Sequence, residues 1–202
     1  EASPFGVFTV TGTAGHPITL ELGTTGTGDG HATSGTDYTN SLEYFNESTN
    51  KWVTYVPGSQ VNVPADGTLQ VRVPILQDTT YEGAETFKLI AKNSAGTAST
   101  GGLGTIVDDG TGTIWPVDPT DPTDPMPPAI GPGPDSSQPP GTFDDDRALS
   151  VDNITVNEAS PFGVFTVTGT AGQPITLELG TTGAGDGHAT SGTDYTNSLE
   201  YF

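Results

Sequence analysis

The sequence predicts an all-β protein, an immunoglobulin-like β-sandwich that is repeated in tandem and joined by a proline-rich extended linker. Three observations support this fold class. Apolar and polar residues alternate with a period of two in several short segments. No long segment has the 3.6-residue periodicity of an amphipathic helix. The sequence of residues 1–45 recurs at 158–202 with two differences, His16 against Gln173 and Thr27 against Ala184. This recurrence indicates a repeating unit of 157 residues.

Short alternating segments supply the predicted strands of the sandwich. The clearest are residues 18–22 and 69–75, in which the apolar side chains all face one way. The full set is 6–11, 18–22, 41–45, 51–55, 69–75, 87–89 and 104–107, separated by turn-forming clusters at 23–35, 46–50, 66–67 and 94–102. Roughly seven short strands in about 110 residues are typical of an immunoglobulin-type sandwich. A domain of that length can bury one core without a metal or a disulfide.

The repeat divides the chain into three parts. We expect residues 1–110 to form a sandwich that lacks its first strand, 111–147 a Pro/Asp-rich linker, and 148–202 the N-terminal part of the next sandwich. Residues 148–157 lead into the second copy as its opening strand, and both ends of the sequence fall inside a unit, as in a piece of a longer protein. The strand at 148–157 is expected either to complete a neighbouring sandwich, building a filament by strand complementation, or to dock back onto residues 1–110.

Proline dominates the linker. Ten of the 17 prolines lie between Pro116 and Pro140, and residues 118–125 read Asp-Pro-Thr-Asp-Pro-Thr-Asp-Pro. Such a tract favours extended polyproline II, at about 3.1 Å per residue. The linker is therefore either a semi-rigid spacer between sandwiches or a disordered connection.

The charge balance excludes several function classes. Twenty-five acidic residues against five Lys plus Arg give a formal net charge of -20, which excludes a basic surface for nucleic acid or anionic lipid. The absence of Cys excludes a disulfide framework and Cys-ligated zinc. No apolar run is long enough to predict a membrane span. No nucleophile stands with a base in a recognisable motif, so we expect no enzyme.

Acidic residues gather in the loops between the predicted strands. Asp78, Glu82 and Glu85 lie in one loop, where they repel one another unless water or a cation screens them. Four further acids border other predicted strands: Glu1, Asp37, Asp108 and Asp109. Alternate connections of a sandwich fall at the same end, so these groups can converge at one pole. Carboxylates on flexible loops are ligands that Ca²⁺ prefers, and the sequence therefore predicts a calcium site there.

Four stretches give residues 1–110, preceded by a strand like 149–157, a resemblance to Calx-β domains. They are 156–158 (Val-Asn-Glu), 30–38 with its Gly-Thr-Asp-Tyr end, 75–87, and 105–109 (Thr-Ile-Val-Asp-Asp). Calx-β domains are sandwiches that bind Ca²⁺ at one end. The resemblance implies as ligands Glu1, Asp37, Asp78, Glu82, Glu85, Asp108 and Asp109, with Glu158 and Asp194 in the next copy. Gln77 and Gly110 stand where the richest members carry further acids, so it implies one or two ions.

The near-identical repetition and the segment 104–110 also resemble the repetitive surface adhesins of bacteria, which are of the RTX, type I secreted style and act in biofilms. That resemblance implies a structural repeat of a long extracellular adhesin or cell-surface fibre, stiffened by Ca²⁺ at the pole of each sandwich. Its partners would be neighbouring repeats and an unknown surface or glycan ligand. The alternative is a glycan- or protein-binding module of a secreted protein, with Trp52 and the loop 23–35 as its contact face. Packing in the core or at its rim is the competing interpretation of Trp52.

Overall fold

The computed structural model describes residues 1–115, 117–118, 121–125, 145–180, 182–183, 185 and 187–201, with the backbone alone for 117–118 and 121–125. Contacts between residues divide the chain into two compact units, Glu1–Ala171 and Gly172–Phe202. The second copy of the repeat therefore spans both units, and its beginning belongs with the first. None of the described residues forms a helix, and so the described chain contains no helix able to cross a membrane.

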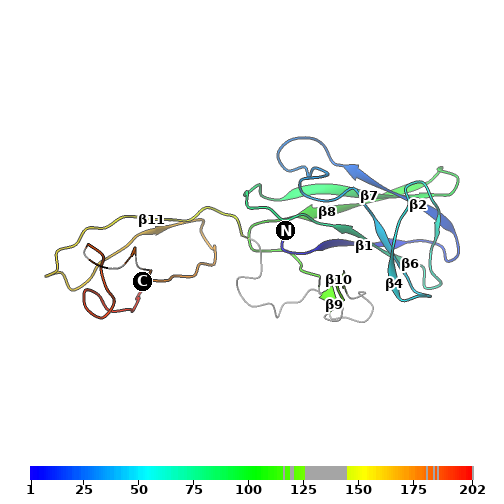
Figure 1. Cartoon of the computed structure of the whole chain (residues 1–202). Coiled ribbons are helices and arrows are strands. Elements are labelled where there is room, and N and C mark those ends of the chain that lie inside the picture. Colours follow the sequence, from blue (N-terminus) through cyan, green and yellow to red (C-terminus); the bar gives the residue numbers. More distant parts are fainter. Residues whose placement is uncertain are drawn as a thin grey trace. The chain divides into compact units, whose positions relative to one another are not determined.

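Two antiparallel four-stranded sheets make up the body of the first unit (Figure 1). One sheet has the strand order β1-β6-β3-β4, and the other has the order β5-β2-β7-β8. The strands are β1 (Phe5–Thr11), β2 (Pro17–Thr24), β3 (Glu43–Asn46), β4 (Lys51–Thr54), β5 (Val61–Asn62), β6 (Thr68–Pro74), β7 (Glu85–Asn93) and β8 (Ser99–Ile106). The expected all-β fold is confirmed, as is each expected strand position, although most strands are longer than the alternation indicates.

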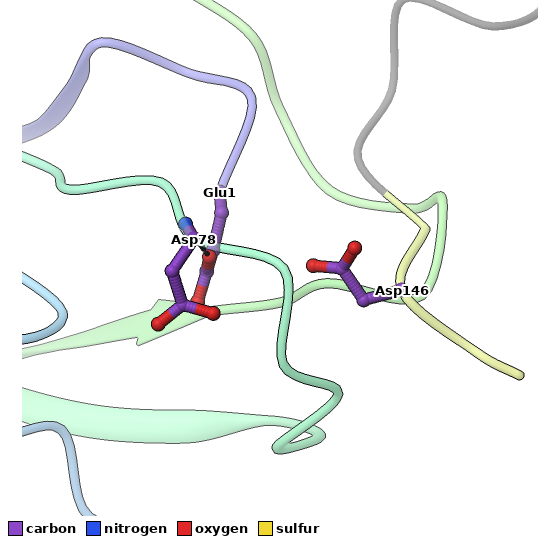
Figure 2. A group of neighbouring side chains, drawn as sticks. All are labelled: Glu1, Asp78 and Asp146. Atoms are coloured by element: carbon purple, nitrogen blue, oxygen red, sulfur yellow. Dashed lines mark hydrogen bonds between the residues drawn. The ribbon is translucent and has the colours of Figure 1, made fainter.

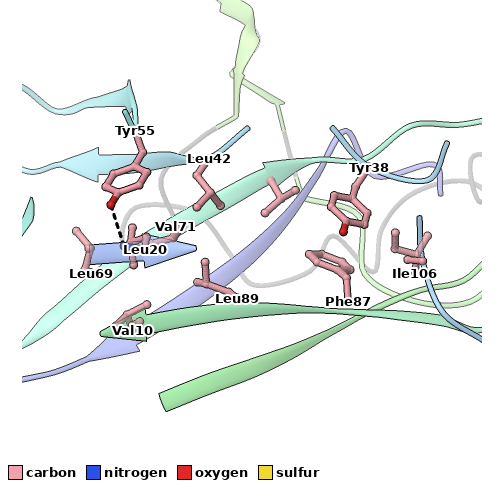
Figure 3. Close-up of a cluster of buried hydrophobic side chains, with 13 residues drawn as sticks. Val10, Leu20, Tyr38, Leu42, Tyr55, Leu69, Val71, Phe87, Leu89 and Ile106 are labelled. Atoms are coloured by element: carbon pink, nitrogen blue, oxygen red, sulfur yellow. Dashed lines mark hydrogen bonds between the residues drawn. The ribbon is translucent and has the colours of Figure 1, made fainter. Parts of the chain in front are cut away.

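One core lies between the two sheets. In β6 the alternation places Leu69, Val71 and Val73 on the inner face, and each is at most 1% exposed. From the opposite sheet, Phe87 stacks on Tyr38 with ring centroids 4.7 Å apart (Figure 3). Fully burying one such side chain stabilises the fold by roughly 1.5–3 kcal/mol. The same packing fixes both sheets at the end where the acidic loops emerge.

Strand β8 is where the sequence-based prediction is wrong in detail. Residues 94–102 were expected to form a turn, but β8 begins at Ser99 and pairs with β7 along its whole length. Glycine is depleted in strands, which is why the glycine-rich sequence of residues 94–102 predicts a turn. Here the glycines serve packing, because a Cβ at Gly104 would lie 2.6 Å from the ring of Phe87 and 2.9 Å from that of Phe8.

The linker differs from the expected polyproline II spacer where its backbone is described. Residues Asp121–Pro125 form β10, which pairs antiparallel with β9 (Val117–Asp118) across a register shift. Residues 116, 119–120 and 126–144 lie outside the described residues, and the expectation of a semi-rigid or disordered spacer stays a prediction for them.

The second copy repeats the sequence of the first without its burial. Leu177 and Leu199 are 43% and 47% exposed, whereas their counterparts Leu20 and Leu42 are 4% and 5% exposed. Strand β12 (Val167–Thr168) is the short counterpart of β1. Residues 158–202 include no counterparts of β6 and β7, which pair with β1 and β2 in the first copy. Strands and core therefore depend on partners that lie later in the repeat.

The segment 148–157 does not dock onto residues 1–110. Its strand, β11 (Ser150–Val151), pairs antiparallel with β12 in its own repeat. This pairing favours a repeat that keeps its opening strand, and it gives no support to exchange of strands along a filament.

Candidate metal centre

Two groups of carboxylates lie at one pole of the sandwich. The inner group consists of Asp37, Glu82 and Glu85, and the outer group consists of Glu1, Asp78 and Asp146. Within each group, one oxygen of every residue lies within 4.8 Å of one oxygen of the others. The structure therefore brings five of the expected residues together in these two groups, and Asp146 is an addition.

A tight turn and a strand end position the inner group. Asp37 closes a turn in which its own N–H donates to Thr33 O at 3.0 Å and its carboxylate accepts from Thr33 N. The carbonyl of Asp37 accepts from Leu76 N at 2.9 Å, which ties the turn to the segment that follows β6. Glu85 is the first residue of β7 and pairs with Ile106 of β8. Backbone hydrogen bonds thus bring the two acids together.

Three carboxylates at this pole are buried with an unsatisfied oxygen. Asp37 is 3% exposed, Glu85 7% and Asp108 1%. Asp37 Oδ1, Glu85 Oε2 and Asp108 Oδ1 have no hydrogen-bond partner. Leaving one buried polar group unpaired costs about 1–3 kcal/mol, and more when the group is charged. Buried polar atoms are otherwise almost always satisfied, so three such oxygens at one pole are a departure that requires an explanation.

The acids at this pole raise one another's pKa values. Burial, and then the charges of Asp37 and Glu82, raise the pKa of Glu85 to about 7. Desolvation raises the pKa of Glu82 too, followed by the charges of Asp37, Asp78 and Asp108. Each carboxylate therefore disfavours ionisation of the next. Within the described chain, no ion pair with Lys or Arg relieves the inner group or Asp108.

The outer group joins the N-terminus, the loop before β7 and the end of the linker. Asp78 N donates to Glu1 Oε2 at 3.2 Å. Asp146 N donates to the carbonyl of Asp108 at 2.9 Å, next to a β-bridge between Asp109 and Asp145. Figure 2 shows the Asp146 side chain directed toward the carboxylates of Glu1 and Asp78. The end of the linker thus contributes a carboxylate to the pole of the first sandwich.

The remaining expected ligands behave differently. Asp108 lies beside the inner group, and its Oδ2 accepts from Glu82 N at 2.6 Å and Gly83 N at 3.3 Å. Asp109 belongs to neither group, because its Oδ1 accepts from Thr111 N at 3.0 Å in a local turn. In the second copy, Glu158 and Asp194 are exposed and belong to neither group. Among the described residues these three acids therefore lie outside both carboxylate groups, and their role as ligands stays a prediction.

Sequence reasoning missed Asp146. A signal was present, since Asp144, Asp145 and Asp146 form an acidic run at the end of the linker. Nothing in that run, however, shows that the chain returns to Asp108 after the linker.

The donor set determines which ions suit the pole. All six grouped residues offer carboxylate oxygens, and neither group contains His. Hard cations such as Ca²⁺ and Mg²⁺ prefer oxygen ligands, whereas zinc sites are built mainly from His and Cys. Ca²⁺ accepts six to eight oxygens in flexible geometry, which suits ligands from several loops better than the strict octahedron of Mg²⁺.

Trp52, the centre of the alternative contact face, is engaged in packing. The Arg72 guanidinium lies 4.4 Å from the centroid of the Trp52 ring, and the Phe45 ring packs against it at 5.5 Å. Arg72 also pairs with Glu43 at 2.5 Å. These contacts support the interpretation of Trp52 as a packing residue.

Comparison of the chain with protein-family models, with curated proteins and with solved structures found no match.

Proposed function

We propose that the acidic pole binds Ca²⁺ and that the bound ion stiffens the repeat. The observation that carries this proposal is the set of unsatisfied buried oxygens on Asp37, Glu85 and Asp108. A cation would turn each of these destabilising atoms into a ligand. It would also offset the mutual repulsion that raises the pKa values of Glu82 and Glu85.

Two adjoining groups suit one or two ions. The inner group and Asp108 supply several oxygens of one coordination sphere, and backbone carbonyls or water complete such spheres in flexible loops. The outer group supplies a second set from three separate segments. An ion there would hold the N-terminal segment and the end of the linker to the same loop, which would restrain the connection between repeats.

The biological role that we propose is structural. The protein would be a repeat of a long extracellular adhesin or surface fibre, of the Calx-β type, that serves cell adhesion or biofilm formation. The 157-residue repetition and the resemblance of the acidic loops support this role. Extracellular modules work with weak calcium sites, with dissociation constants of about 10⁻⁴–10⁻³ M, and one or two ions held by carboxylates fit that range.

The proposal is tested by melting the chain with Ca²⁺ and with chelator, alongside calorimetric titration. Free ion at 100 times its dissociation constant stabilises the fold by about 2.7 kcal/mol, which is a shift on the order of 10 °C for a domain of this size. Asp108→Asn is the sharpest variant, because its carbonyl oxygen can still accept from Glu82 N while the other ligand oxygen is lost. Glu47→Gln, an exposed acid in the β3–β4 turn, is the control.

We expect Asp108→Asn to reduce the calcium-dependent shift and Glu47→Gln to leave it unchanged. Equal melting temperatures in excess Ca²⁺ and in chelator would refute the metal site. A calcium-dependent shift that is equally large in both variants would show that ions bind elsewhere.

A further inference from the structure

A groove of about 440 Å³ lies between β1 and β8, the neighbouring edge strands of the two sheets (Figure 1). Its apolar lining includes Phe8, Ile75, Phe87 and Ile106. Among the described residues, β1 pairs only with β6, and β8 pairs only with β7. Two strands therefore present unpaired backbone edges to one apolar groove, and such edges are templates for a further strand.

The hydrogen-bond pattern shows which backbone groups of β1 face the groove. Gly12 N donates to Gly67 O at 2.9 Å, and Pro4 O accepts from Ile75 N at 3.1 Å, so even-numbered positions bond toward β6. In an antiparallel ladder the backbone groups of successive residues point to opposite sides. Thr9 occupies an odd position, and its N–H and C=O therefore face away from β6, toward the unpaired edge.

The second copy carries a strand on this edge. Asp152 N donates to Thr166 O at 3.1 Å, and Thr166 N donates to Asp152 Oδ1 at 2.7 Å. Thr166 is the counterpart of Thr9 in the repeat. Residues 150–152 thus lie antiparallel along the edge that is unpaired in the first copy.

Side chains of that segment face the interior. A Cβ at Gly163 would lie 3.0 Å from Ile154 Cδ1 and 3.9 Å from Val156 Cγ1. At the counterpart, Gly6, a Cβ would meet Ile75 and Phe87 of the core. Ile154 and Val156 therefore lie on the face of the strand that points into the groove in the first copy.

We propose that the β1–β8 groove is an acceptor site for a β-strand with the sequence of residues 149–157, running antiparallel to β1. The acceptor strand has the same sequence in both copies, since residues 1–15 and 158–172 are identical. Backbone hydrogen bonds supply affinity in this mode of recognition, and pockets for alternate side chains supply specificity. Binding of a strand in this groove requires no metal and is independent of the function proposed above.

The opposite wall explains why the groove is deep enough for such a strand. Gly102 and Gly104 of β8 carry no side chain, and a Cβ at either position would contact the ring of Phe8. The aromatic rings therefore lie directly against the β8 backbone, and residues 111–115 line the groove beside it. In the second copy, Val151 and Val156 are 57% and 53% exposed, and residues 158–202 include no counterpart of β8.

The experiment adds a dye-labelled, C-terminally amidated peptide of residues 149–157 to the full 202-residue chain, in chelator. Binding is followed by fluorescence anisotropy and mapped on an assigned amide NMR spectrum. We expect saturable binding of one peptide per chain and new protection from hydrogen exchange at Thr9 and Thr11, the counterparts of the paired Thr166 and Thr168. Gly6, Phe8 and Val10 should change little, since their N–H groups already bond to β6.

Variants of the peptide cannot unfold the acceptor, which keeps the test decisive. Ile154→Asp should weaken binding at least about tenfold, because it places a charge in an apolar groove. Thr155→Asp, on the opposite face of the same strand, should change affinity less than about threefold. Absence of binding, equal effects of the two variants, or protection confined to residues 158–168 of the second copy would overturn the proposal.

Discussion

Glu85→Gln separates electrostatic repulsion from metal binding at the inner group. Glu85 is 7% exposed, and its pKa of about 7 lies above the ordinary value of 4.5. Between these values the folded state holds a proton that the unfolded state has released. The stability of the metal-free protein therefore falls as pH rises from about 4.5 to 7, and stays low above that. The shift corresponds to a penalty on the order of 3 kcal/mol at pH 8.

Glutamine removes the ionisation and with it this penalty. In chelator at pH 8, the variant should be more stable than the parent chain by up to about 3 kcal/mol, on the order of 10 °C in melting temperature. In excess Ca²⁺ the order should reverse, because the parent gains a ligand and the variant loses one. Thermal melts at pH 5 and pH 8, with and without Ca²⁺, give all four comparisons.

Glu47→Gln serves as the control, since Glu47 is exposed and lies outside both acidic groups. It should melt like the parent chain under all four conditions. If metal-free parent chain were equally stable at pH 5 and pH 8, the repulsion argument would be wrong. If Glu85→Gln lowered stability equally with Ca²⁺ and with chelator, Glu85 would be a packing residue and not a ligand.

Three further predictions concern the site and its support. Asp37→Asn should weaken calcium binding in a calorimetric titration, whereas Asp194→Asn, the same change in the exposed second copy, should leave it unaltered. Asp146→Asn should lower the calcium-dependent rise in melting temperature while leaving the metal-free melt unchanged; an identical rise would exclude Asp146 as a ligand. Phe87→Ala should cost about 3–5 kcal/mol in urea unfolding, because its buried ring packs against Tyr38 and Phe8; a loss below 1 kcal/mol would contradict the assigned core.

Period-two alternation predicted most of the fold because it reports burial directly. Residues 69–75 alternate cleanly, and β6 is the strand whose inner side chains are most buried. The same signal failed at β8, where the inner positions are Gly102 and Gly104. There the packing partner is backbone against the Phe8 and Phe87 rings, and a pattern of side chains cannot reveal it.

The two copies separate local from long-range determinants of the site. In both, the first residue of the acidic turn donates its N–H to the carboxylate four residues on, Thr33 to Asp37 and Thr190 to Asp194. The turn is therefore encoded by its own few residues. Burial of Asp37 to 3% exposure requires the strands that follow it in the first copy, and Asp194, which lacks them, is exposed. The local sequence therefore determines the shape of the turn that carries Asp37. The strands that follow it in the first copy bury the carboxylate.

Asp146 marks the limit of inference from spacing. Acids that are close together in the sequence, such as Asp78, Glu82 and Glu85, can be recognised as a candidate site from their spacing alone. Asp146 lies at the end of the linker, and pairing of the Asp145–Asp146 backbone with residues 108–109 brings it to the pole. That pairing places the end of the linker against the sandwich before it. A cation in the outer group would therefore bind at the junction between the sandwich and the linker, where it would limit the bending of the chain between repeats.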